Sequence, residues 1–174
     1  MSKIRWGIVG TGSIASAFAH SIKYCQYSEL IGVHGRSDDK LNSFSSKFDI
    51  KPYKDINDLI ASKEIDAVYI ATPHSSHYEY SLLAIKNKKH ILCEKPMTIN
   101  HLESMVLLNL AKEAEVFLME AYMYRVHPQT FNILDNLSIF DNKKNKITIT
   151  SSFGFSADLP ESHRLRNPYM GGGA

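Results

Sequence analysis

The chain has 174 residues, 44% hydrophobic and 22% charged, which is the composition of an ordinary globular protein that can bury a core. Its 20 basic and 18 acidic side chains leave a formal net charge of +2, so no nucleic-acid partner is expected, because that would require a clustered basic face. No apolar run approaches the roughly 18 residues that span a bilayer, and Cys25 and Cys93 make no disulfide framework or metal-site spacing, so we expect a soluble cytoplasmic protein with no membrane partner.

Short apolar runs alternate with longer amphipathic runs along most of the chain. The run Ile4–Val9 predicts a strand and leaves no room for a signal peptide. Ile14, Phe18 and Ile22 then fall four residues apart and predict a helix. Later strands are predicted at Leu30–Val33, Ala67–Ala71, His90–Cys93 and Val116–Met119. Later helices are predicted from Leu41 to Phe48, Asp55 to Ala61, Tyr78 to Ile85 and Leu102 to Leu110, the last opened by a capping box of Asn100 and Glu103.

Apolar strands that alternate with helices predict a parallel sheet covered on both faces. We therefore expect a doubly wound α/β domain in residues 1–122. Beyond it the pattern changes, because Pro128 opens a helix with Phe131 and Leu134, and Lys146–Phe155 alternates with period two, as in a half-exposed antiparallel strand. One helix and one strand cannot bury a core alone, so residues 123–174 are expected to be the beginning of a second, truncated unit.

The first predicted strand is followed by Gly10-Thr11-Gly12-Ser13-Ile14-Ala15, which fits the dinucleotide pattern G-x-G-x-x-G/A. Gly10 permits the tight turn, Gly12 lacks a Cβ that would block a diphosphate, and Ala15 lets the helix lie close to the strand. The diphosphate would bind the amides at the start of the helix. A glycine turn without a ligand is the competing interpretation, and the position at the first crossover favours nucleotide binding.

The end of the second strand bears on which dinucleotide binds. An acidic residue there would take the ribose 2′-hydroxyl of NAD, but the sequence has Arg36 and Ser37, and acids follow only at Asp38 and Asp39. A guanidinium fork suits a phosphate, so the sequence favours NADP over NAD. The alternative is that Arg36 is a solvated loop cation.

Two later strands also end in polar residues at the expected ligand-binding edge of the sheet. Thr72 and Pro73 follow one strand and are placed to contact the cofactor, whereas His74 and His77 lack a third ligand and predict no metal site. Lys95 follows the next strand, where its ammonium could stabilise an alkoxide-like substrate oxygen. Glu94 could pair with it or hold a cofactor ribose, and an exposed Glu–Lys pair without function is the alternative.

The segment Met119–Pro128 joins the two units. Its aromatic and methionine side chains are interpreted as packing. Arg125 and His127 are polar groups at the expected interdomain crevice, where small-molecule sites concentrate, and are candidates for substrate contact.

Taken together, GTGSIA, ATPHSSH, EKP and MEAYMYRVHP, in this order and spacing, resemble the Gfo/Idh/MocA oxidoreductase family, especially the branch that contains NADP-dependent D-xylose and dihydrodiol dehydrogenases. The resemblance implies a Rossmann domain, followed by an α+β domain with an open antiparallel sheet through which a homo-oligomer forms. It implies hydride transfer between NADP and a carbinol carbon of a sugar, polyol or cyclic diol.

The resemblance also implies roles for individual residues. Lys95 would be the catalytic lysine, and the nucleotide contacts would come from Gly10, Gly12, Ser13, Ile14, Arg36, Ser37, Thr72, Pro73, His77, Glu94 and Lys95. The family's Tyr or His proton donor follows a segment that corresponds to Gly171–Ala174, so the chain is expected to be an N-terminal fragment, inactive alone. A non-catalytic nucleotide-binding or sugar-sensing module is the alternative, and Lys95 favours the enzyme.

Overall fold

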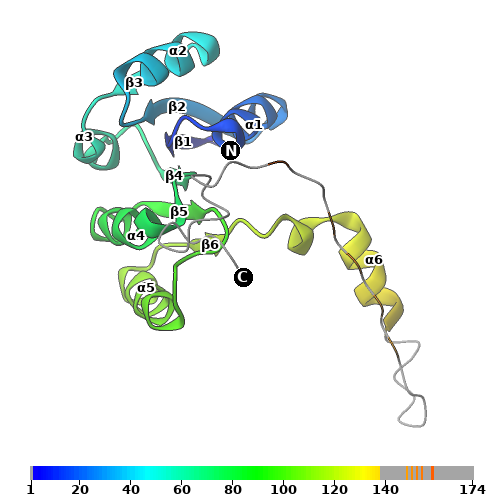
Figure 1. Ribbon diagram of the computed structural model, residues 1–174. Helices are drawn as coiled ribbons and strands as arrows, with labels where there is room; N and C mark the ends of the chain where they lie inside the picture. The colour runs from blue at the N-terminus through cyan, green and yellow to red at the C-terminus, as the bar shows by residue number, and fades with distance from the viewer. Residues whose placement is uncertain are drawn as a thin grey trace.

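Six parallel strands form the central sheet of the computed structural model, which describes residues 2–137 and the single residues 148, 150, 152, 154 and 158 (Figure 1). The strand order is β3-β2-β1-β4-β5-β6. The strands are β1 Ile4–Val9, β2 Ser28–His34, β3 Lys51–Tyr53, β4 Ala67–Ile70, β5 His90–Cys93 and β6 Leu118–Glu120. The order reverses between β1 and β4, and such a switch point is where ligands bind in open α/β sheets.

Helices cover both faces of this sheet (Figure 1). The α-helices are α1 Ser13–Ser21, α2 Asp38–Phe48, α3 Ile56–Ala61, α4 His77–Lys86, α5 His101–Ala114 and α6 Pro128–Leu137, and the short 3₁₀ helices are η1 Ile22–Tyr24, η2 His74–Ser76 and η3 Met123–Val126. Ile8 packs with α1 and α2, while its neighbour Val9 packs with α3, α4 and α5, because successive strand residues point to opposite faces. The predicted doubly wound α/β fold is therefore confirmed.

The predicted strands and helices recur in the described residues in the same order, although several of their bounds differ by one to four residues. β3 was missed because it has only three residues, includes Pro52 and lies at the sheet edge, where proline is tolerated. β6 begins at Leu118 rather than Val116. In α5, Leu102 is 75% exposed, whereas Leu107 and Ala111 are the buried positions.

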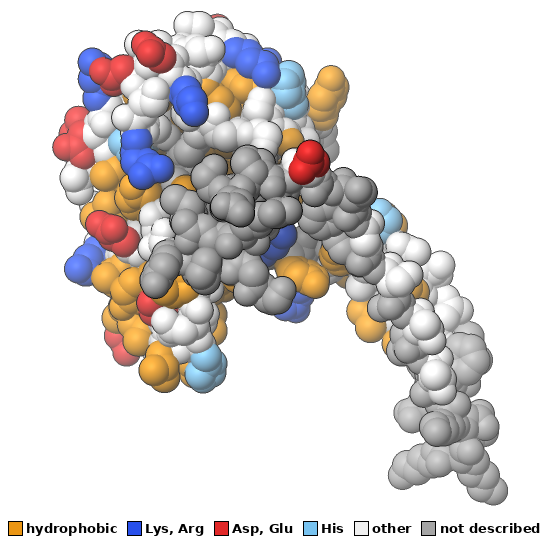
Figure 2. Space-filling model, in the orientation of Figure 1, with side chains coloured by type: hydrophobic (Ala, Val, Ile, Leu, Met, Phe, Trp, Pro, Cys, Tyr) orange, Lys and Arg blue, Asp and Glu red, His pale blue; other side chains and the backbone are white. Residues whose placement is uncertain are grey.

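Helix α6 extends away from the sheet (Figure 1), and its Phe131 and Leu134 are more than half exposed. The strand expected over Lys146–Phe155 falls almost wholly outside the described residues, and the domain division at residue 122 stays a prediction. No helix in the described part of the chain is long and apolar enough to cross a membrane. Figure 2 shows basic and acidic side chains interspersed on the face it draws, as the nearly balanced composition predicts.

Candidate nucleotide-binding and catalytic site

The turn after β1 is held between the ends of β2 and β4. Gly10 has a φ of 121°, and its N–H donates to the carbonyl oxygen of His34 at 2.8 Å. A Cβ at this position would lie 2.4 Å from the carbonyl oxygen of Ala71. Both the backbone conformation and the close approach therefore require glycine.

Gly12 is different, because a Cβ there would meet no protein atom within 4 Å. It is the N-cap of α1, no side chain caps this helix, and the first turn contains no acidic residue. Ser13 and Ile14 begin the helix and are exposed, whereas Ala15 is fully buried against the sheet. Open space next to helix amides and the positive end of the helix dipole fits the diphosphate of a dinucleotide.

Arg36 and Ser37 lie between β2 and α2, as expected for residues near an adenosine ribose. Arg36 is exposed and makes no ion pair with the other described residues. The Ser37 hydroxyl oxygen caps α2 by accepting from the Lys40 N–H at 3.5 Å, which leaves its O–H proton for another acceptor. The Asp38 carboxylate lies 3.6 Å from the Lys54 ammonium. The positive charge of Lys54 therefore offsets part of the repulsion between Asp38 and a phosphate bound nearby.

The turn after β4 is closed by its own side chains. The Ser76 hydroxyl lies 2.8 Å from both the Thr72 hydroxyl and the carbonyl oxygen of Pro73. His77 is fully buried, with Nε2 2.9 Å from the Thr72 carbonyl oxygen and Nδ1 2.8 Å from the Pro96 carbonyl oxygen. Its ring therefore joins the loop after β4 to the loop after β5.

Glu94 and Lys95 follow β5, and their side chains are not paired with each other. Within the described residues, the Glu94 carboxylate accepts from the Tyr69 hydroxyl at 2.6 Å and from the Lys95 backbone N–H at 3.2 Å. The Lys95 side chain is exposed and forms no ion pair with another described residue. Glu94 and Lys95 therefore form no ion pair with each other, and the role of each residue stays a prediction.

Burial, followed by the hydrogen bond to Glu94, raises the pKa of the Tyr69 hydroxyl well above its usual range. Tyr69 therefore keeps its proton at neutral pH and donates a hydrogen bond to Glu94. The Glu120 carboxylate supports the same loop, because it accepts from the Met97 N–H at 2.8 Å. Burial raises the pKa of the Cys93 thiol to about 12, so this cysteine is a neutral packing residue.

Tyr69 and Glu120 were missed by the sequence analysis. Tyr69 looks like any aromatic residue in a buried strand, and nothing in the sequence marks its partner. Glu120 carries a recognisable signal, since an acidic residue at the end of an apolar strand needs a donor nearby.

Arg125 and His127 lie in and just after η3, beyond β6, and both are exposed. In the described residues, no hydrogen bond or ion pair links either side chain to the Lys95 loop, and His127 Nδ1 accepts instead from the Gln129 N–H at 3.1 Å. Their candidate role in substrate contact stays a prediction.

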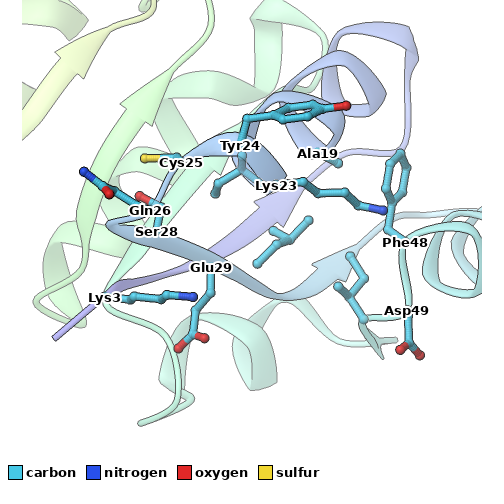
Figure 3. A pocket seen from close by; sticks show the side chains of 13 residues that line it. Lys3, Ala19, Lys23, Tyr24, Cys25, Gln26, Ser28, Glu29, Phe48 and Asp49 are labelled. Carbon is cyan, nitrogen blue, oxygen red and sulfur yellow. The ribbon is translucent and has the colours of Figure 1, made fainter.

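An open cavity of about 490 Å³ lies elsewhere on the fold (Figure 3). Its lining comes from the end of α1, from η1, from the beginning of β2 and from the end of α2. Lys3 and Glu29 lie at the amino-terminal ends of β1 and β2, whereas Gly10 and Lys95 follow the carboxyl-terminal ends of their strands. The cavity is therefore not part of the candidate site.

Comparison with known proteins agrees with this geometry. A model of an oxidoreductase family with an NAD-binding Rossmann fold matches residues 4–122. The chain is 31% identical to the D-xylose 1-dehydrogenase (NADP(+)) of Hypocrea jecorina, over 98% of this chain and 49% of that protein. It is 31% identical to the trans-1,2-dihydrobenzene-1,2-diol dehydrogenase of Danio rerio, over 98% of this chain and 51% of that protein.

Among solved structures, a 3-ketoreductase from Actinomadura kijaniata, in complex with NADP and TDP-benzene, has a TM-score of 0.74 and 29% identity, over 79% of this chain and 43% of that one. The chain thus spans about half the length of the two curated relatives, at 49% and 51%.

Proposed function

The chain belongs to the Gfo/Idh/MocA oxidoreductase family, and on this premise we propose that the whole protein transfers hydride between NADP and a carbinol carbon of a sugar, polyol or cyclic diol. The observation that carries the proposal is the position of the Gly10–Gly12 turn and of Lys95. They follow β1 and β5, the two strands that flank β4, and so lie at the carboxyl-terminal ends of the parallel strands. A relative named for D-xylose and another named for a diol support the substrate class.

The chain's own groups are suited to hold NADP, which supplies the hydride acceptor or donor when it is bound. The amides of Ser13 and Ile14 bind the diphosphate, with Gly10 and Gly12 leaving room for it. Arg36 and Ser37 bind the 2′-phosphate. The nicotinamide half is bound by the loops after β4 and β5, through Thr72, Pro73, Glu94 and Lys95.

Lys95 is the proposed catalytic residue. Its ammonium donates a hydrogen bond to the substrate oxygen and stabilises the negative charge that develops there. Proton transfer belongs to a Tyr or His that the family resemblance places beyond Ala174, and Arg125 and His127 contact the substrate from the segment after β6. We further propose that residues 1–122 form the cofactor domain and that residues 123–174 begin a substrate domain through which the whole protein forms a homo-oligomer.

Titration with NADP and NAD tests the proposal directly. The single tryptophan, Trp6, lies in β1, and its ring packs edge-on against Phe18 of α1 with the ring centroids 5.4 Å apart. Its fluorescence therefore reports on the contact between β1 and α1. Saturable binding with tighter affinity for NADP is expected. Binding of neither dinucleotide would refute the proposal, and tighter binding of NAD would refute the cofactor assignment alone.

A further inference from the structure

The end of β2 lies directly beside the turn that follows β1. The Gly10 N–H donates to the carbonyl oxygen of His34 at 2.8 Å, and the next residue of each segment, Thr11 and Gly35, are in contact as well. A Cβ at Gly35 would lie 2.7 Å from Cγ2 of Thr11, 3.3 Å from its Oγ1 and 3.6 Å from its Cβ. The Thr11 side chain therefore fills the volume in which a side chain at position 35 would begin.

This contact, and not the backbone conformation, requires glycine at position 35, because Gly35 lacks the positive φ of Gly10. Thr11 carries two heavy atoms on its Cβ, and both lie closer to position 35 than that Cβ does. A rotation of χ1 to another staggered position would leave at least one of the two places occupied. Room for a larger residue therefore requires removal of the Thr11 branches or a movement of the turn.

The volume taken by Thr11 bears on cofactor choice. A Rossmann domain that binds NAD carries an acidic residue at the end of the second strand, where its carboxylate binds the ribose 2′-hydroxyl. The same carboxylate would repel the 2′-phosphate of NADP. His34 is buried, with its ring Nδ1 2.9 Å from the carbonyl oxygen of Tyr53, and Arg36 is basic. Position 35, between them, is the place left for such a carboxylate.

We propose that Thr11 and Gly35 are a specificity-determining pair, in which the Thr11 side chain excludes a carboxylate from position 35 and leaves Arg36 unopposed in binding the 2′-phosphate. Arg36 forms no ion pair with another described residue. One of the acids that follow, Asp38, lies 3.6 Å from the Lys54 ammonium. The inference rests on the proposed function and deepens it, because it adds a steric contact to the basic side chain that favours NADP.

A double-mutant cycle tests the contact without any cofactor. Gly35→Ala places a Cβ 2.7 Å from Cγ2 of Thr11, whereas in a Thr11→Ala background the contact that remains is with the Cβ of residue 11 at 3.6 Å. Urea denaturation should therefore show that Gly35→Ala raises the unfolding equilibrium constant about tenfold beside Thr11, but less than about threefold beside Ala. Equal effects in both backgrounds would overturn the proposal, even if larger substitutions at position 35 fail to fold.

Titrations with NADP and NAD test the specificity. Gly35→Asp alone should not bind NAD more tightly than the wild type does, because Thr11 blocks the new side chain. In the double variant Thr11→Ala/Gly35→Asp, the ratio of NADP affinity to NAD affinity should fall on the order of a hundredfold, since the carboxylate can bind the 2′-hydroxyl and repels the phosphate. Thr11→Ala/Gly35→Asn is the matched control of the same shape without the charge, and it should lower the ratio much less.

The outcomes separate this inference from the proposed function. An unchanged ratio in the folded Asp double variant, or tighter NAD binding by Gly35→Asp alone, would overturn the role of the pair while NADP binding by the wild type still supports the proposed function. Binding of neither dinucleotide by the wild-type chain would refute both.

Discussion

The hydroxyl of Tyr69 donates a hydrogen bond to Oε1 of Glu94 at 2.6 Å, and this bond joins β4 to the first residue after β5. The ring of Tyr69 is stacked on Phe18 of α1, with centroids 4.1 Å apart. The orientation of the Glu94 carboxylate is thus fixed by the helix that also presents its amino terminus to the proposed diphosphate. One tyrosine connects the two halves of the candidate site.

Tyr69→Phe should keep the stacking on Phe18 and remove only the hydrogen bond to Glu94. Because Oε1 of this part-buried carboxylate then loses its donor, while Oε2 still accepts from the Lys95 N–H, NADP affinity is expected to fall roughly tenfold, as for the loss of one hydrogen bond to a charged group. Tyr53→Phe is the matched control, since Tyr53 packs on the opposite face of the sheet and its hydroxyl donates to Ser62. Isothermal titration calorimetry of both variants measures the difference, and equal affinities would contradict the role given to Tyr69.

Gly12→Ala and Gly10→Ala should separate ligand binding from folding. A Cβ at Gly12 meets no protein atom, so the variant should lose less than about 1 kcal/mol of unfolding free energy but bind NADP more than about tenfold more weakly. At Gly10 the positive φ and the Ala71 carbonyl oppose a Cβ, and a loss of about 2–4 kcal/mol is expected. Urea denaturation and NADP titration give the two readouts, and normal NADP binding by Gly12→Ala would exclude this turn as the diphosphate site.

Arg36→Ala is expected to weaken NADP binding by about 10- to 100-fold, because one charge-assisted contact to the 2′-phosphate is lost. NAD lacks that phosphate, so its affinity should change little. Lys40→Ala, an exposed cation in the first turn of α2, is the control. Parallel titrations with both dinucleotides measure the ratio of affinities. An equal loss of affinity for NADP and NAD would show that Arg36 does not bind the 2′-phosphate.

Lys95→Ala in the whole protein should lower kcat by at least about a hundredfold, since an electrostatic contact to the reacting oxygen is removed. NADP affinity should fall much less. Lys112→Ala, at an exposed position in the last turn of α5, should leave both unchanged. Steady-state assays with aldoses, inositols and cyclic diols test this, and an unchanged kcat would favour a nucleotide-binding module without turnover.

The Arg5–Asp66 pair predicts a pH dependence of stability. The hydrogen bond from Arg5 lowers the pKa of Asp66, so the pair stabilises the folded chain above the ordinary carboxyl pKa of about 4 and ceases to do so as pH falls through the lowered value. Both side chains are 37% exposed, so solvent screens the pair and its contribution to stability is small. Asp66→Asn should therefore be less stable than the wild type at pH 7, and the difference should shrink at acid pH, as measured by urea denaturation. A difference that is the same at both pH values would contradict this account.

The sequence predicts the fold and the Gly10–Gly12 turn because their signals are local. Ile4–Val9, Gly10 and Gly12 form one contiguous strand–turn–helix pattern. The contact between Tyr69 and Glu94 instead depends on the register of β4 and β5, in which Ile70 lies opposite Cys93, and no local pattern encodes that register.

Helix α5 was predicted as an element, but its buried face was not evident. Leu102, Met105 and Val106 form an apolar stripe, and Leu107 with Ala111 forms another. Only packing against α4 and the sheet decides that the second stripe is buried. Sequence periodicity alone gives two equivalent answers there.

Gly10 also has a kinetic consequence. Its N–H donates to the His34 carbonyl oxygen, a Cβ on it would meet the Ala71 carbonyl oxygen, and the Ala71 N–H donates to the Val9 carbonyl oxygen, so the turn proposed to bind the diphosphate is preorganised before any ligand arrives. Little ordering entropy remains to be lost on association. The dinucleotide should therefore bind in a single concentration-dependent phase, without a slow rearrangement of this loop after the encounter.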